Sequence, residues 1–197
     1  RVRRMAEETI GLIAGNGRFP VLFARAAKAK GLKVVAVAMH GETVPDLDAE
    51  VDSITWVRVG QLKRMIQAFQ RAGVRRAAMA GGVRKTRLFE RARPDLLSLK
   101  LLARAVIRPD DGLLRAVAHE FERAGIQIVD STIYMPEALA PSGVLTVKAP
   151  TKEEWSDLRY GLRIAMEIGK LDIGQTVLVK SGVVVALEAV EGTDACI

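Results

Sequence analysis

"TIGLIAGNGRFPVLFARAAKAKGLKVVAVAM" (9–39) decides the fold of this 197-residue chain. A short apolar run ends at a glycine turn, a helical stretch opens at Pro20 and stops at Gly31, and a second apolar run follows. Proline suits the first turn of a helix, where its missing N–H costs nothing. Near-continuous apolar runs suit parallel strands covered on both faces. The stretch therefore predicts a strand, a helix and a second strand.

The same alternation continues to residue 133. Further strands are predicted at 53–59, 75–82 and 126–132, and further helices at 61–73, 94–108 and 110–125. Alternating strands and helices are typical of a mainly parallel sheet with helices on its faces. We therefore expect an α/β, Rossmann-like domain over 9–133, with helices on both faces of the sheet.

The alternating pattern of strands and helices ends after residue 133. Residues 134–143 contain two prolines and a glycine without periodicity, which indicates a linker. Beyond it, a helix at 152–169 and a hairpin of two strands at 175–180 and 183–190 are predicted. Ser181-Gly182 between the strands suits a tight turn. Residues 144–197 are expected to form the start of a smaller, incomplete α/β domain.

Composition excludes several classes of protein. The single cysteine, Cys196, excludes an internal disulfide framework and fits a reducing compartment. We find no signal peptide and no apolar run near the ~18 residues that span a bilayer. These features predict a cytoplasmic protein.

The net charge of +7 is concentrated in one segment. Residues 84–108 contain eight Lys and Arg against two acidic residues. Such a segment forms either a solvated helix face or a surface for phosphate, anionic lipid or nucleic acid. Its leucines either pack in the core or lie against a membrane. The aromatic content of 5% and the absence of a recognised motif argue against nucleic acid.

The first glycine turn fails as a dinucleotide site. Gly15 and Gly17 satisfy two positions of the fingerprint, but Pro20 stands where the third glycine belongs. The second strand also lacks a carboxylate at its end, since Glu42 comes late. A glycine turn that leads into a helix still offers backbone N–H groups and a positive dipole end to an anion.

A second glycine turn strengthens the anion hypothesis. Gly81-Gly82 also follows a strand, and Arg84 and Lys85 come directly after it. Ligands of open parallel sheets lie beyond the carboxyl ends of the strands. The two turns and the two cations are therefore predicted to converge on a phosphate, although each turn alone is also an ordinary connection.

Acidic residues give two weaker candidates. Asp110 and Asp111 either cap a helix or bind magnesium or sugar hydroxyls. Glu191 and Asp194 lie in a predicted loop, either as solvated acids or in a binding site.

The remaining residues of interest are assigned structural roles. His40 and His119 have no companions at zinc-ligand spacing, and His119 is expected to be structural. Trp56 is expected in the core rather than as a stacking platform.

Taken together, these stretches resemble a known family, the UDP-2,3-diacylglucosamine pyrophosphatases of the LpxI type from lipid A synthesis. The resemblance rests on "GLIAGNGRFP", "AGGVRK", "DDGLLRAV" and the long "EIGKLDIGQTVLVKSGVVVALEAVEGTDA", in matching order and spacing. It implies a bacterial enzyme that hydrolyses UDP-2,3-diacylglucosamine to 2,3-diacylglucosamine 1-phosphate (lipid X) and UMP. It further implies Mg²⁺ or Mn²⁺ as cofactor, a homodimer, and a place in the cytoplasm or at the surface of the inner membrane.

The resemblance also assigns site residues. Substrate-binding residues lining a cleft between the two domains would be Gly15, Asn16, Gly17, Phe19, Pro20, Gly81, Gly82, Lys85, Asp110, Asp111, Gln175 and Thr193. Glu191 and Asp194 would bind the metal, and Asp194 is the candidate catalytic residue.

One departure from the family pattern affects the expected activity. Family members continue into an Asp-Leu-Pro-Thr segment that this sequence does not contain, so we expect the C-terminal portion to be lacking. The alternative to the hydrolase is therefore a sugar-nucleotide or phospholipid-binding module without catalysis.

Overall fold

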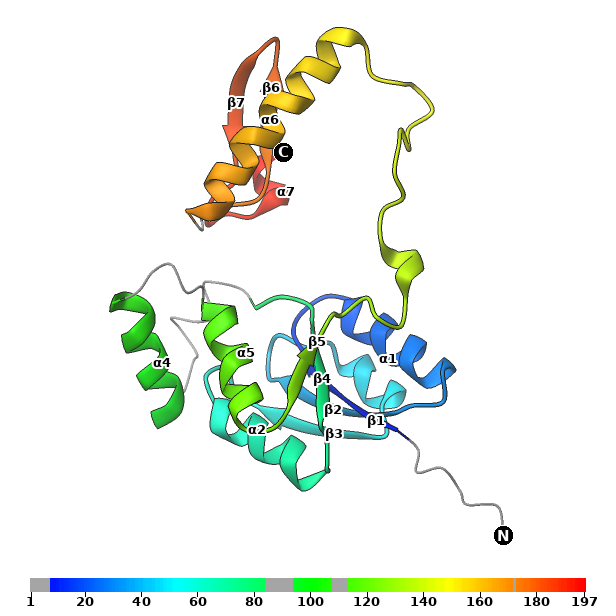
Figure 1. The fold of residues 1–197 in the computed structure, drawn as a ribbon, viewed down its shortest axis with the longest axis vertical. Helices are drawn as coiled ribbons and strands as arrows, with labels where there is room; N and C mark the ends of the chain where they lie inside the picture. The colour runs from blue at the N-terminus through cyan, green and yellow to red at the C-terminus, as the bar shows by residue number, and fades with distance from the viewer. Residues whose placement is uncertain (1–7, 84–93, 108–112, 172) are drawn as a thin grey trace. The chain divides into compact units, whose positions relative to one another are not determined.

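The computed structural model describes residues 8–83, 94–107, 113–171 and 173–197. The chain folds as two compact units, Arg1–Leu139 and Ala140–Ile197, each with its own sheet. Figure 1 labels the helices and strands of both units.

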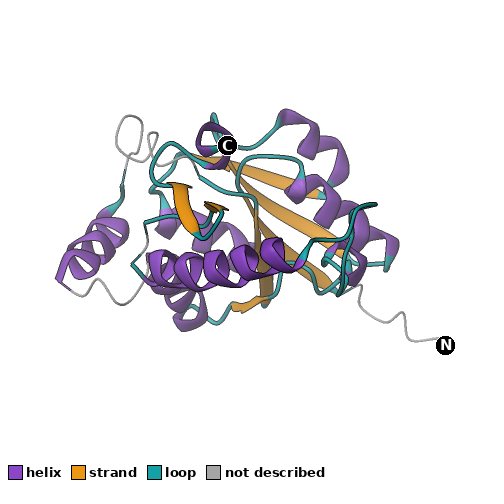
Figure 2. Ribbon diagram, turned by 90° about the horizontal axis from the view of Figure 1, so that it is seen from above, coloured by secondary structure: helices purple, strands orange, loops and turns teal. Residues whose placement is uncertain are grey.

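The first unit is built on a five-stranded parallel sheet. Its strands are β1 (Thr9–Ala14), β2 (Lys33–Met39), β3 (Ser53–Val57), β4 (Arg76–Ala80) and β5 (Gln127–Val129). They lie in the order β3-β2-β1-β4-β5, and in Figure 2 they run side by side. β1 pairs with β2 on one side and with β4 on the other, so the strand order reverses beside β1. This arrangement confirms the predicted Rossmann-like parallel sheet.

Helices cover both faces of this sheet, as predicted. They are α1 (Phe19–Ala29), α2 (Leu62–Arg71), α4 (Leu96–Ile107) and α5 (Leu113–Arg123), with the short 3-10 helices η1 (Pro45–Glu50) and η2 (Pro136–Ala138). Phe23 of α1 and Leu47 of η1 are fully buried in the core on one face. Phe69 of α2 and Phe121 of α5 meet on the other, with ring centroids 6.0 Å apart.

α2 shows how the sequence pattern becomes packing. Its buried residues are Leu62, Met65, Ile66 and Phe69, which repeat at the spacing of one helix face. The chain leaves the helix through Gly73, whose φ of +69° is in the left-handed region. The polar face of α2 stays in solvent.

The leucine side of α4 packs in the core. Leu101 is buried and Leu97 is half-buried among the residues of α2 and α5, whereas Lys100 is exposed. Leu96 and Leu99 remain exposed to solvent. Residues 84–93 and 108 of the basic segment lie outside the described residues. None of the helices in the described ranges combines the length and the apolar character that crossing a membrane requires.

The start of the predicted linker belongs to the core of the first unit. Met135 is buried there, and the ring of Tyr134 packs against Phe23 with centroids 5.7 Å apart. Burial of the apolar surface of Tyr134 and Met135 in the core is more favourable than its exposure to water in an extended linker.

The second unit packs one long helix on a hairpin. Its elements are α6 (Lys152–Lys170), β6 (Val177–Lys180), β7 (Val183–Leu187) and the one-turn helix α7 (Thr193–Cys196). Thr151 and Glu154 form a capping box, with N···O distances of 2.7 and 3.2 Å. β6 and β7 are antiparallel, and α6 packs on β6.

The hairpin turn is the one predicted. Ser181 and Gly182 have φ of 53° and 77°, the two positive values that a type I′ turn requires. Asp157 of α6 accepts hydrogen bonds from both turn amides, at 2.8 Å from Ser181 N and 2.7 Å from Gly182 N. This carboxylate therefore fixes the hairpin to the helix.

Candidate functional site

The loop after β1 is hydrogen-bonded to the loop after β4. Gly15 N donates to Ala80 O at 2.8 Å, and Asn16 N donates to Gly82 O at 2.7 Å. Both loops leave the carboxyl ends of neighbouring parallel strands, at the point where the strand order reverses. This is the position at which open α/β sheets bind ligands.

The contact between the two turns requires glycine on both sides. A Cβ on Gly15 would overlap the carbonyl oxygen of Gly82, and a Cβ on Gly81 would overlap the carbonyl oxygen of Asn16. Gly81 also has a φ of +78°. The two turns that the sequence singled out thus touch, although Lys85 lies outside the described residues.

Asn16 connects three loops through its side chain. Its Oδ1 accepts from Gly82 N at 3.2 Å, and its Nδ2 donates to Glu42 Oε2 at 3.2 Å. Glu42 is buried, with 5% of its surface exposed. Sequence reasoning set Glu42 aside as too late for a ribose contact. In the structure its carboxylate turns back and holds the first glycine turn.

Thr43 secures the same loop from the other side. Its hydroxyl donates to Ala14 O at 2.7 Å and accepts from Met39 N at 2.8 Å. The hydroxyl is buried, so it satisfies two backbone groups that water does not reach. The loops after β1, β2 and β4 therefore form one connected edge of the sheet.

The start of α1 is open to an anion. Gly17 is exposed, has a φ of +79° and would meet nothing within 4 Å if it carried a Cβ. Arg18 occupies the cap position, Pro20 lies in the first turn, and no described side chain caps the helix. The first turn also contains no acidic residue. Backbone N–H groups and the positive end of the helix dipole are thus available to a negative group.

In the second unit, the loops beside the hairpin meet around Glu188, which sequence reasoning missed. Its carboxylate accepts from Gln175 N at 3.3 Å. The hydroxyl of Thr176 is the largest of the influences that hold the pKa of Glu188 below its usual range. Thr176 Oγ1 also lies 3.4 Å from Thr193 Oγ1. Two of the predicted site residues, Gln175 and Thr193, therefore share Glu188 as a partner.

The predicted acids of the last loop differ in their contacts. Glu191 Oε1 accepts from Ala189 N at 2.9 Å, which closes the turn after β7. Asp194 is exposed in the first turn of α7. Burial, followed by the charges of Glu191 and Glu188, raises the pKa of the Cys196 thiol. This thiol is therefore a poor nucleophile at neutral pH.

No metal site is complete within the part of the chain that the structure describes. No group of three or more His, Cys, Asp or Glu side chains there could hold a metal ion. Glu191 and Asp194 thus lack a third described ligand of these types. Asp110 and Asp111 lie outside the described residues.

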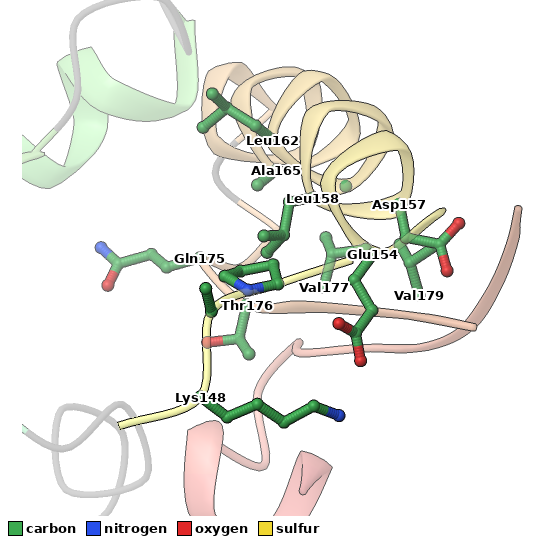
Figure 3. A pocket seen from close by; sticks show the side chains of 13 residues that line it. Lys148, Glu154, Asp157, Leu158, Leu162, Ala165, Gln175, Thr176, Val177 and Val179 are labelled. Carbon is green, nitrogen blue, oxygen red and sulfur yellow. The ribbon is translucent and has the colours of Figure 1, made fainter. Parts of the chain in front are cut away.

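A pocket of about 720 Å³ opens on the second unit between α6 and β6. Leu158, Leu162 and Ala165 of α6 line it together with Val177 and Val179 of β6. Figure 3 shows the side chain of Gln175 pointing away from these apolar residues and Lys148 on the side remote from α6. Asp157 also lines the pocket, but its carboxylate already accepts a hydrogen bond from the hairpin turn.

Comparison with known proteins identifies the family. Residues 9–138 match the model of the LpxI N-terminal domain, and residues 141–197 match that of the LpxI C-terminal domain. The chain is 35% identical over 189 residues to UDP-2,3-diacylglucosamine pyrophosphatase LpxI from Caulobacter vibrioides. The match covers 94% of this chain and 66% of the length of that relative.

Likeness to solved structures is lower. The biotin carboxylase subunit of a pyruvate carboxylase is 18% identical, with a TM-score of 0.37, over 64% of this chain and 24% of that one. The biotin carboxylase domain of a single-chain bacterial carboxylase is 15% identical, with a TM-score of 0.36, over 89% of this chain and 31% of that one. Neither likeness carries a functional conclusion. The two domain models and the Caulobacter relative show the family, and by them the chain belongs to the LpxI family.

Proposed function

We propose that this sequence acts in the hydrolysis of UDP-2,3-diacylglucosamine to 2,3-diacylglucosamine 1-phosphate and UMP. The family supports this proposal, because its Caulobacter member is named a UDP-2,3-diacylglucosamine pyrophosphatase. The structural observation that supports it is the contact between the two glycine turns, because this contact fixes the uncapped start of α1 beyond the carboxyl ends of the strands, where open α/β sheets bind ligands.

The geometry narrows the groups that would meet the diphosphate. The amides of Gly15, Asn16 and Gly82 already donate to protein oxygens. The N–H groups from Gly17 to Phe19 have no backbone acceptor within the described residues. We therefore assign phosphate binding to the start of α1, and the glycine contact holds that start in place.

Fixed donors are what a phosphoryl transfer needs. Charge on the phosphoryl oxygens must be neutralised while water attacks in line with the leaving group. Backbone N–H groups held by a rigid frame supply this without reorganising. Lys85 and the paired Asp110 and Asp111 would extend the same site, as the family resemblance implies.

The general base and the metal ligand of the proposal come from the second unit. Asp194 is proposed as the general base, with Glu191 beside it as a ligand of Mg²⁺ or Mn²⁺. Such an ion neutralises phosphate charge and lowers the pKa of bound water. The described residues form no group of three His, Cys, Asp or Glu ligands, and EDTA in the assay tests the metal dependence.

The assay incubates the 197-residue chain with UDP-2,3-diacylglucosamine and Mg²⁺ and measures UMP. Release of UMP that stops with EDTA and with Asp194→Asn supports the proposal, and Asp48→Asn serves as a matched control on an exposed acid of η1. Binding of UMP or lipid X by calorimetry without release of UMP indicates the non-catalytic binding module instead. If the chain neither binds UMP or lipid X nor releases UMP, both the hydrolase and the binding module are excluded.

Assembly and location complete the proposal. We expect a homodimer in the cytoplasm that contacts the inner membrane surface through its basic segment. Sedimentation of the purified chain tests the dimer. Flotation with vesicles that contain anionic lipid, at low and high salt, tests the membrane contact, since an electrostatic attachment weakens as salt rises.

A further inference from the structure

A pair of stacked rings lies at the carboxyl ends of the strands, where the glycine turns also lie. The rings of His40 and Trp56 have centroids 5.3 Å apart and planes inclined by 28°. Trp56 is in β3 and pairs with Ala38 of β2, and His40 is the residue that follows β2. His40 N donates to Val57 O at 2.9 Å, which continues the strand pairing by one more residue.

The stack is open to solvent. His40 is exposed and Trp56 is half-buried, whereas Val57 beside it is in the core. A tryptophan buries much apolar area when the core accepts it. This one instead rests against an imidazole at the edge of the sheet, with aromatic surface left uncovered.

The stack is tied to the proposed phosphate site. The loop that begins with His40 continues into Glu42, which binds Asn16, and Thr43, which binds Ala14. Neighbouring parallel strands lie about 4.8 Å apart, so the end of β3 lies roughly 10 Å from the end of β1 across the sheet. That separation suits a nucleotide whose phosphate is at α1 and whose base is over β2 and β3.

We propose that the solvent-exposed part of the His40–Trp56 stack receives the base of a pyrimidine nucleotide. An aromatic face binds a base by stacking and needs no particular hydrogen-bonding edge. The phosphate end of this assignment and the choice of a pyrimidine rest on the proposed function, whereas the position of the base rests on the stack. The competing explanation is that the imidazole only shields the tryptophan at the sheet edge.

The test uses two ligands that differ only in the base, UMP and ribose 5-phosphate. The chain has two tryptophans, Trp56 and Trp155, so Trp155→Phe leaves Trp56 as the sole reporter. Stacking of uracil should quench its fluorescence as UMP binds, and ribose 5-phosphate should leave it unchanged. Because stacking on an aromatic side chain strengthens binding about ten-fold or more, we expect UMP to bind at least about ten-fold more tightly.

Variants of the two histidines give the matched control. His40→Ala should weaken UMP about five-fold or more and leave ribose 5-phosphate unchanged, since one ring of the stack is lost. The chain's other histidine, His119, is exposed on α5, so His119→Ala should change the affinity for neither UMP nor ribose 5-phosphate. Circular dichroism of each variant verifies that the fold is kept.

The outcomes separate this inference from the proposed function. Equal binding of the two ligands without quenching overturns the stacking assignment and leaves the phosphate site standing. Preference for UMP without quenching and without an effect of His40→Ala also overturns it, because the base would then lie elsewhere. Failure of both ligands to bind at millimolar concentration overturns the stacking assignment together with the proposed phosphate site.

Discussion

Replacing Gly15 by alanine tests whether the two glycine turns must touch. The added Cβ would overlap the carbonyl oxygen of Gly82 and lie 2.8 Å from the carbonyl carbon of Gly81. Both atoms belong to the backbone, so no side-chain rotation can relieve the overlap. The two turns must therefore separate.

The expected loss of stability is large for one methyl group. Overpacking of a tight contact costs about 1–3 kcal/mol. Separation also weakens the bonds from Gly15 N to Ala80 O and from Asn16 N to Gly82 O, each worth about 1 kcal/mol. A total near 3 kcal/mol, at about 4 °C per kcal/mol for a unit of this size, lowers the unfolding midpoint by about 12 °C.

Thermal unfolding in the Trp155→Phe background measures this effect, because the fluorescence of Trp56 then reports on the first unit. Gly31→Ala is the control. Gly31 has a φ of +79° and open space around it, so alanine there meets backbone strain of about 1–2 kcal/mol and no overlap. A midpoint for Gly15→Ala equal to or above that of Gly31→Ala would refute the reasoning.

Further predictions concern single polar groups and one helix. Thr43→Val keeps the shape but leaves a buried N–H and a buried C=O unpaired, so urea unfolding should show a loss of about 2–3 kcal/mol that Thr43→Ser does not share. Asp157→Ala removes the acceptor of both hairpin amides and should destabilise the second unit by about 1–2 kcal/mol. The fluorescence of Trp155 measures this, and an unchanged unfolding midpoint would argue against a stabilising role of the Asp157 hydrogen bonds. The pKa of Glu188 is lowered in the folded state, chiefly by Thr176, so its stabilising effect is complete above the ordinary glutamate pKa of about 4.3 and is lost as the pH falls through the lower folded value. Thr176→Val should flatten this acid-side decline in unfolding midpoint, and an identical decline in both proteins would contradict the assignment. Gly169→Ala places a methyl group in open space on α6 and should raise stability by about 0.5 kcal/mol in the same assay, a gain that a fall in midpoint would disprove.

The fold could be predicted because its signals are local. Apolar runs of strand length alternate with helical periodicity, and this alternation dictates a parallel sheet covered by helices. The turns at Gly15 and Gly81 were visible because each follows a strand and each glycine has a backbone reason to be there. Ser181-Gly182 was predictable because the pair lies between two runs of strand character, and in the structure both residues adopt the positive φ of a tight turn.

The missed residues act through contacts that no local pattern encodes. Glu42 meets Asn16 across 26 positions, and its position after β2 gave no sign that the side chain turns back to the first loop. Trp56 was expected in the core, but β3 is an edge strand, and the ring meets His40 instead. Glu188 stands in a predicted strand, where its pairing with the loop at Gln175 depends on the hairpin register.

The central position of β1 determines when its two neighbours can reach it during synthesis. β2 begins at Lys33, soon after β1, whereas β4 begins at Arg76, about sixty residues after β1 ends. At about 5–20 residues per second, the ribosome takes roughly 3–12 s to deliver β4. For that interval one edge of β1 has no strand beside it, and the nascent chain cannot close the contact between Gly15 and Gly82 until the second turn has left the exit tunnel.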